Sequence, residues 1–158
     1  MCRKYFKRLL LHKWYVFILC FKQGLVWRGI IHDYDKFYPC NFKAFAECAF
    51  GEIAKTISKK DSRWIPEDRK LLMPILNHVH RWDHHWQSWM MFGDEGDGQL
   101  VDMSREAIIE MICDWEAARR AHKSAKTTLQ WFREHGKLFI SDNTKLLIEE
   151  ILKGNICE

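Results

Sequence analysis

The chain of 158 residues is rich in apolar and aromatic side chains, with eight Trp and ten Phe against only eight Gly and three Pro. This length suits one domain with a single hydrophobic core, and the composition excludes a disordered or low-complexity protein. The net charge of +4 is unevenly spread, because residues 1–60 carry 12 Lys and Arg against 4 Asp and Glu, whereas the remainder carries 13 against 17.

The excess of basic residues in positions 1–60 indicates what kind of ligand the protein could bind. An excess of Lys and Arg favours a phosphate-bearing ligand, although a solvated basic face on the first helix would give the same excess. No recognised nucleic-acid-binding motif accompanies it, so we do not expect a nucleic-acid partner.

The cysteines and the N-terminal segment indicate in which cellular compartment we expect the protein. None of the six cysteines forms a Cys-x-x-Cys pair or has zinc-knuckle spacing, and Cys20 and Cys113 fall in apolar stretches typical of a core. The apolar run Trp14–Phe21 has eight residues, which is too few to span a bilayer, and no cleavage site follows it. We therefore expect a cytoplasmic protein without a membrane segment.

The first third of the chain predicts three helices. Residues 4–22 carry large apolar groups on most sides, which indicates a well-buried helix ending at Gln23-Gly24. Residues 25–33 predict a short second helix that delivers His32 and Asp33. After the break at Tyr38-Pro39, Asn41 can cap a third helix through about residue 57.

The middle of the chain predicts a helix and a hairpin. Pro66-Glu67-Asp68 is a helix-start signal after a polar loop at 59–62, and Pro74 must kink or restart that helix. Residues 89–92 and 99–103 can pair as a small hairpin around an acidic, glycine-rich turn.

The last third predicts three more helices. Ser104 caps the first of them, and two others are expected at about 124–135 and 143–153. Asp142 or Asn143 can cap the last helix, and Gly154 closes it. The sequence therefore predicts one compact all-α domain over residues 1–158, with six or seven helices.

The stretch from His32 to Lys36 carries the main chemical signal. Adjacent imidazole and carboxylate donors, here His32 and Asp33, suit a divalent transition metal better than calcium, and Lys36 is placed to meet an anionic ligand of that metal. His12 and Asp114 also fall at the apolar side of predicted helices, where a carboxylate is costly to bury unless it is paired or bound to metal. Each residue alone has an ordinary explanation as a hydrogen-bonded core group, so the hypothesis depends on their joint occurrence.

A second group of histidines lies between these residues in the sequence. His80 and His84 stand four apart and would share a face of a continuous helix, as would His78 and His85 on another face. A helix break near Trp82-Asp83 would remove both pairings, and the sequence leaves the two cases open. The interleaved tryptophans also allow a simple aromatic surface.

At this point the residues resemble a known family. The order His12, His32-Asp33 and Asp114 on helices of an all-α fold resembles the HD-domain superfamily of metal-dependent phosphohydrolases. His-Asp-x-x-Lys is similar to the His-Asp-x-Gly-Lys form of many members, with Asp35 in place of the usual Gly, and members with two metals also use histidines between the two motifs. The whole chain more closely resembles a family of small bacterial and phage proteins of unknown function, through His12-Lys13-Trp14-Tyr15-Val16, His32-Asp33-x-x-Lys36-Phe37, His84-His85-Trp86-Gln87 and Asp114-Trp115.

The HD resemblance implies a phosphohydrolase that acts on a nucleotide or nucleotide-like phosphoester. One or two ions of Mn, Fe, Ni, Co or Zn would be held by the four residues His12, His32, Asp33 and Asp114. The residues expected to act on the phosphate are Lys36, His80, His84 and His85. By analogy with HD-like folds, the resemblance also implies a possible homodimer.

Two other functions fit the same residues. The pocket could hold a metal or a nucleotide without turnover, for example in a phage protein that sequesters a signalling nucleotide. Alternatively, the protein could be structural, with the histidines packing against tryptophan.

Overall fold

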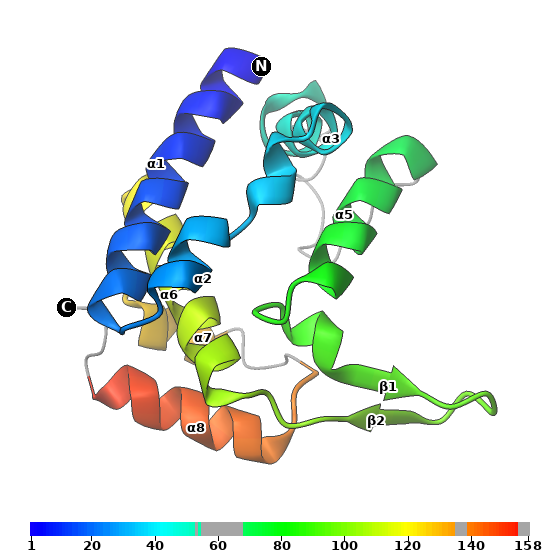
Figure 1. The fold of residues 1–158 in the computed structure, drawn as a ribbon, viewed down its shortest axis with the longest axis vertical. Helices are drawn as coiled ribbons and strands as arrows, with labels where there is room; N and C mark the ends of the chain where they lie inside the picture. Colours follow the sequence, from blue (N-terminus) through cyan, green and yellow to red (C-terminus); the bar gives the residue numbers. More distant parts are fainter. Residues whose placement is uncertain (53, 55–67, 135–138, 155–158) are drawn as a thin grey trace.

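The structure is a computed structural model that describes residues 1–52, 54, 68–134 and 139–154. These residues form seven α-helices, two 3-10 helices and one two-stranded antiparallel hairpin, which projects from the helices (Figure 1). The prediction of an all-α fold with six or seven helices and a small hairpin is therefore confirmed. Within the described ranges, no helix is both long and apolar enough to cross a membrane.

The long first helix, α1 (Cys2–Lys22), packs along α6 (Arg105–His122). Its buried residues Val16, Leu19 and Cys20 meet Cys113 and Ala117 of α6 in one core cluster. Both cysteines predicted to be core residues, Cys20 and Cys113, are buried. This packing fixes α1 and α6 side by side, and each helix carries one of the predicted ligands.

The short helix α2 (Val26–Ile31) lies against α1 because Gly29 allows close approach. A Cβ atom at Gly29 would lie 2.9 Å from Cys20 Cβ and 3.1 Å from Phe17 Cα. Lys13 closes the end of α2, since its Nζ donates to the carbonyls of Ile30 at 2.7 Å and His32 at 2.6 Å. The helix thus ends at Ile31, and the predicted helix over 25–33 is two residues too long at its C-terminal end.

The helices α3 (Pro39–Phe50) and α5 (Arg69–Arg81) pack against each other. Pro39 begins α3, so Asn41 is not its cap; the Asn41 amide donates instead to the Asp35 carbonyl at 3.0 Å. Asp68 caps α5 by accepting from the Lys70 amide at 2.9 Å.

Several predicted features of this region can be compared only in part with the structure. The expected end of the third helix near 57, the polar loop at 59–62 and the start signal at 66–67 lie outside the described residues. Pro74 lies inside α5, which continues past it to Arg81.

A short 3-10 helix, Trp86–Trp89, leads from α5 into strands β1 (Met90–Phe92) and β2 (Gly98–Leu100). Met90 pairs with Leu100 and Phe92 with Gly98. The predicted hairpin is confirmed, with shorter strands than expected.

The C-terminal part forms the second main core cluster. Its apolar residues come from α6, α7 (Thr128–Glu134), α8 (Asp142–Lys153) and the adjoining segments, and include Ile108, Met111, Ile112, Phe132, Ile140, Ile148 and Ile151. Ser104 caps α6 as predicted, accepting from the Ala107 amide. The α8 cap is Ser141, which accepts from the Thr144 amide, so the prediction of Asp142 or Asn143 is wrong by one or two residues.

Candidate metal centre

Asp33 occupies the turn between α2 and the 3-10 helix Tyr34–Phe37. Its backbone is left-handed, with φ 54°, which is uncommon for a residue other than glycine and is best tolerated by Asp and Asn. The side chain is 1% exposed, and Lys36 Nζ lies 2.5 Å from Oδ2. The chain thus accepts an unfavourable backbone conformation that aims a carboxylate into the interior.

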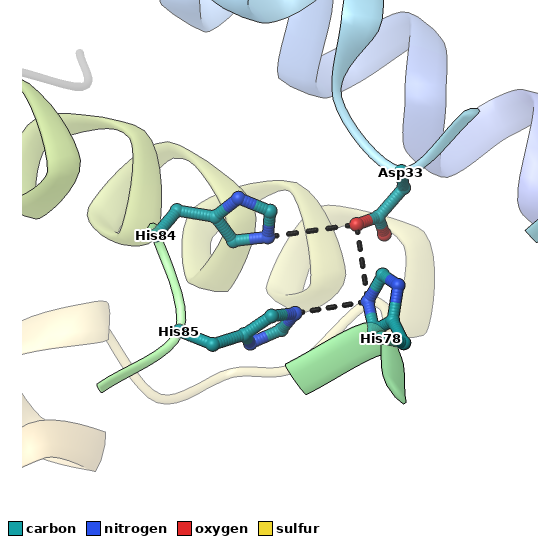
Figure 2. Close-up of side chains that lie close together, drawn as sticks. All are labelled: Asp33, His78, His84 and His85. Carbon is teal, nitrogen blue, oxygen red and sulfur yellow. Dashed lines mark hydrogen bonds and ion pairs between the residues drawn. The ribbon is translucent and has the colours of Figure 1, made fainter. Parts of the chain in front are cut away.

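One carboxylate oxygen of Asp33 faces a group of histidines. Asp33 Oδ1 lies 3.3 Å from His78 Nε2 and 3.5 Å from His84 Nε2, and His85 Nε2 lies 2.9 Å from His78 Nε2 (Figure 2). One donor atom from each of these four residues lies within 4.8 Å of the others, so they could hold one metal ion. We call Asp33, His78, His84 and His85 the second ligand group, because another group of possible ligands begins earlier in the chain, at His12.

The other oxygen of Asp33 faces the residues that the sequence first indicated. Asp33 Oδ2 lies 3.3 Å from His32 Nε2. His12 Nε2 and His32 Nε2 lie 3.0 Å and 3.8 Å from Asp114 Oδ1, and these three residues form a separate set that could hold a metal. We call His12, His32 and Asp114 the first ligand group; Asp33 lies between the two groups.

Carboxylates stand behind three of the imidazoles. His32 Nδ1 lies 2.8 Å from Glu110 Oε1 and His78 Nδ1 lies 3.0 Å from Asp35 Oδ1. His84 Nδ1 lies 3.1 Å from the same Glu110 oxygen, without the alignment of a hydrogen bond. Metal-binding histidines are commonly oriented in this way, with Nδ1 on a carboxylate and Nε2 toward the ion. We therefore assign Glu110 and Asp35 as orienting groups, although His32, His84 and Glu110 also lie close enough to be a set of ligands.

Several polar atoms of the centre are buried and lack a hydrogen-bond partner. His32 Nε2, His84 Nε2 and Asp33 Oδ1 make no hydrogen bond. A buried polar atom without a partner costs on the order of 1–3 kcal/mol. A metal ion held beside Asp33 would give these atoms the partner that the side chains alone do not supply.

The charges of the centre would suit a bound cation. Asp33, Asp35, Glu110 and Asp114 are carboxylates, and among the described residues only Lys36 and Arg28 pair with any of them as permanent cations. Neutral imidazoles would leave an excess of buried negative charge, which is unfavourable unless a cation or protons balance it.

The pKa values of the buried groups reflect a balance between the effect of burial and the effect of neighbouring charges. Burial opposes the charge of His32, but Asp33, Asp114 and Glu110 outweigh it and raise its pKa well above the usual value. Burial also opposes ionisation of Asp33, but His32 and Lys36 lower its pKa well below the usual value. His85 differs, since burial and the neighbouring His84 lower its pKa to about 3 and keep the imidazole neutral.

An ion-pair network holds the segment that follows α5. Arg28 donates to both carboxylate oxygens of Asp83, at 2.8 Å and 2.6 Å, and to Glu110 Oε2 at 2.6 Å. Trp82 Nε1 donates to Asp35 Oδ1 at 2.9 Å. These contacts turn the chain out of the helix after Arg81 and direct His84 toward Asp33.

The structure brings together most of the predicted site residues. His12, His32, Asp33 and Asp114 converge, with Lys36, His84 and His85 beside them. The structure does not bring His80 to them. Because α5 ends at Arg81, the four-residue spacing no longer puts His80 and His84 on one helix face, and His80 lines another cavity with Asn77 and Asp35.

Sequence reasoning missed Glu110 and the orienting role of Asp35, and left His78 open. A signal for Glu110 was present, since it lies four residues before Asp114 on the same helix and between apolar neighbours. His78 and His85 do meet, but through the turn after α5 and not through a shared helix face.

A cavity of about 360 Å³ adjoins the first ligand group. Its lining includes His12, Asp114 and Lys36, and also Tyr5 and Arg8. A small molecule bound in this cavity would therefore contact the ligand residues themselves.

The fold and this centre define a mostly helical protein with a buried histidine–carboxylate cluster that could bind metal. The chain belongs to the family of unknown function DUF5662, which matches residues 1–154. No curated protein and no solved structure matches the chain.

Proposed function

We propose that the protein is a metal-dependent phosphohydrolase that acts on a small nucleotide-like phosphoester. The observation that carries this proposal is the position of Asp33, whose two carboxylate oxygens face imidazole nitrogens of the two ligand groups. A carboxylate in that position suits one ion or a pair of ions that share it. Ions held close together by a shared carboxylate are typical of phosphoester hydrolysis.

The donor set suits a divalent transition metal. Imidazole nitrogen combined with carboxylate oxygen favours Mn, Fe, Co, Ni or Zn over Ca. The orienting carboxylates, the unsatisfied Nε2 atoms of His32 and His84, and the excess negative charge all support an ion at this place. A bound ion would polarise a phosphoryl oxygen and lower the pKa of a water molecule.

The residues around the centre support a phosphate ester as substrate. Lys36 contacts Asp33 and lines the cavity, so its ammonium can neutralise charge on a phosphate next to the first ligand group. The histidine and aspartate order that resembles HD-domain phosphohydrolases lies in this same place, and supports hydrolysis over transfer to another acceptor. That resemblance remains part of the proposal.

Metal content is the first test. Purified protein should contain about one or two equivalents of a transition metal by elemental analysis, and should release phosphate from simple phosphomonoesters when that metal is present. His78→Ala and Asp33→Ala should lose metal and activity.

His80→Ala is the matched control, because His80 lies two residues from His78 on the same helix but outside both ligand groups. It should keep metal and activity. Absence of metal in the wild-type protein, with none taken up on addition, would refute the proposal. Metal bound by the wild type with no phosphate released would point to a non-catalytic binder.

A further inference from the structure

The cavity beside the metal centre has the size of a small ligand. Its volume of about 360 Å³ is at the lower end for ligand pockets. Space arises because the helices that face it contribute small side chains, namely Ala49, Ala118 and Ala121. A molecule no larger than a mononucleotide fits this space, whereas a nucleic-acid strand does not.

Arg8 is a cation in the wall of this cavity, and it makes no ion pair within the described residues. Its guanidinium lies 4.4 Å from the centre of the Phe50 ring, and in the described part of the chain it makes no ion pair with a carboxylate. By contrast, Lys36 pairs with Asp33, and Arg28 pairs with Asp83 and Glu110. Arg8 is half-buried, and burial lowers its pKa. A partly buried guanidinium without an anion is unfavourable, so an anionic ligand would stabilise it.

Arg8 lies apart from the metal ligands along the same helix. It precedes His12 by four residues, which is roughly one helical turn of about 5.4 Å. Side chains on a helix lean toward its N-terminus, so the long side chain of Arg8 carries its charge further from His12. An anion at Arg8 is therefore distinct from a phosphate held next to His12 and Asp114.

We propose that Arg8 recognises a second anionic group on a small organic phosphate whose phosphoester lies at the metal centre. The position of the phosphoester rests on the proposed function, whereas the anion site at Arg8 rests on the cavity and on the lack of a carboxylate partner for Arg8 among the described residues. Arg8 is thus a specificity residue that selects substrates with two separated negative groups.

A matched pair of ligands tests this inference. 3-Phosphoglycerate has a carboxylate where glycerol 3-phosphate has a hydroxymethyl group, so the two differ in the second anionic group. Binding of each is measured by calorimetry on the full chain, with the metal that elemental analysis identifies. The wild type should bind 3-phosphoglycerate on the order of tenfold more tightly, as expected for a charge-assisted contact.

Arg8→Gln should reduce this ratio to near one. Lys7→Gln is the control, because it removes the same charge from an exposed neighbour on α1 that does not line the cavity, and it should keep the wild-type ratio. If Arg8→Gln does not fold, as judged by circular dichroism, Arg8→Lys replaces it and should lower the ratio partly, since it keeps the charge but loses the planar fork.

Three results would overturn the inference: equal affinity of the wild type for both ligands, no binding of either, or an unchanged ratio in the Arg8 variant. Failure of the proposed function is measured separately on the wild type, as missing metal or missing phosphate release. The anion contact is measured by equilibrium binding and needs no turnover.

Discussion

Replacing Glu110 by Gln tests whether the carboxylates behind the imidazoles belong to the metal centre. Glu110 is 2% exposed and contacts three residues of the centre. Its oxygens lie 2.6 Å from Arg28 Nη1, 2.8 Å from His32 Nδ1 and 3.1 Å from His84 Nδ1. Glutamine keeps the shape of the side chain and removes its charge.

The expected loss can be worked from these contacts. Charge-assisted hydrogen bonds are roughly twice as strong as neutral ones, and each contributes about 1.5–3 kcal/mol. The two hydrogen bonds of Glu110 are those with Arg28 and His32. Because Arg28 keeps Asp83 as a partner, these bonds lose only part of their strength, about 2–3 kcal/mol together. Removal of an orienting carboxylate typically lowers metal affinity by about 10- to 100-fold. Glu110→Gln should therefore melt roughly 5–10 °C lower and bind metal at least tenfold more weakly.

Glu116→Gln is the matched control on the same helix. Glu116 is also a buried carboxylate, and it accepts from Arg119, Arg120 and Thr128 at 2.7 Å each, away from both ligand groups. Metal titration and thermal melting of both variants separate the two effects, because Glu116→Gln should lose stability but keep metal affinity. Wild-type metal affinity in Glu110→Gln, or equal loss of affinity in both variants, would refute the orienting role.

Three further predictions concern packing, the ion and the cavity. Gly29→Ala should cost about 1–3 kcal/mol in thermal unfolding, because its Cβ would meet Cys20 Cβ at 2.9 Å and the Phe17 backbone at 3.1 Å; an unchanged melting temperature would show that α2 can shift freely. Chelation should lower the melting temperature of the wild type by roughly 5–10 °C, since an ion at about 100 times its Kd adds about 2.7 kcal/mol, and should leave His78→Ala unchanged; equal shifts would place the ion elsewhere. Lys36→Met should reduce kcat by about 100-fold while the metal content stays the same; loss of metal instead would make Lys36 structural.

Much of the fold could be predicted from local chemistry. Ser104 and Gly154 mark helix ends as expected, and the long apolar helix ending at Gln23-Gly24 is observed. Ligand-type residues at the apolar side of these helices, such as His12 and Asp114, were visible because burying them without a partner is costly.

The turn after α5 could not be predicted in the same way. The helix ends at Arg81 without a glycine or proline, and its end coincides with distant contacts, those of Trp82 with Asp35 and of Asp83 with Arg28. Spacing along a helix therefore could not place His80 relative to His84. The position of Glu110 four residues before Asp114 was a local signal, but its role depends on partners in α2 and in the turn after α5, which lie far away in the sequence.

The distribution of the ligand residues along the chain also shapes how the protein folds. His32 and Glu110 meet although they are 78 positions apart, and Arg28 and Glu110 are 82 apart. No single segment contains a complete ligand group. The second ligand group is complete once His85 has been made, but the first ligand group also needs Asp114 of α6, so a growing chain has no finished centre before α6. Contacts of such long range carry a loop-closure cost that slows folding. A metal ion that recognises only the finished arrangement would slow unfolding and leave the folding rate little changed.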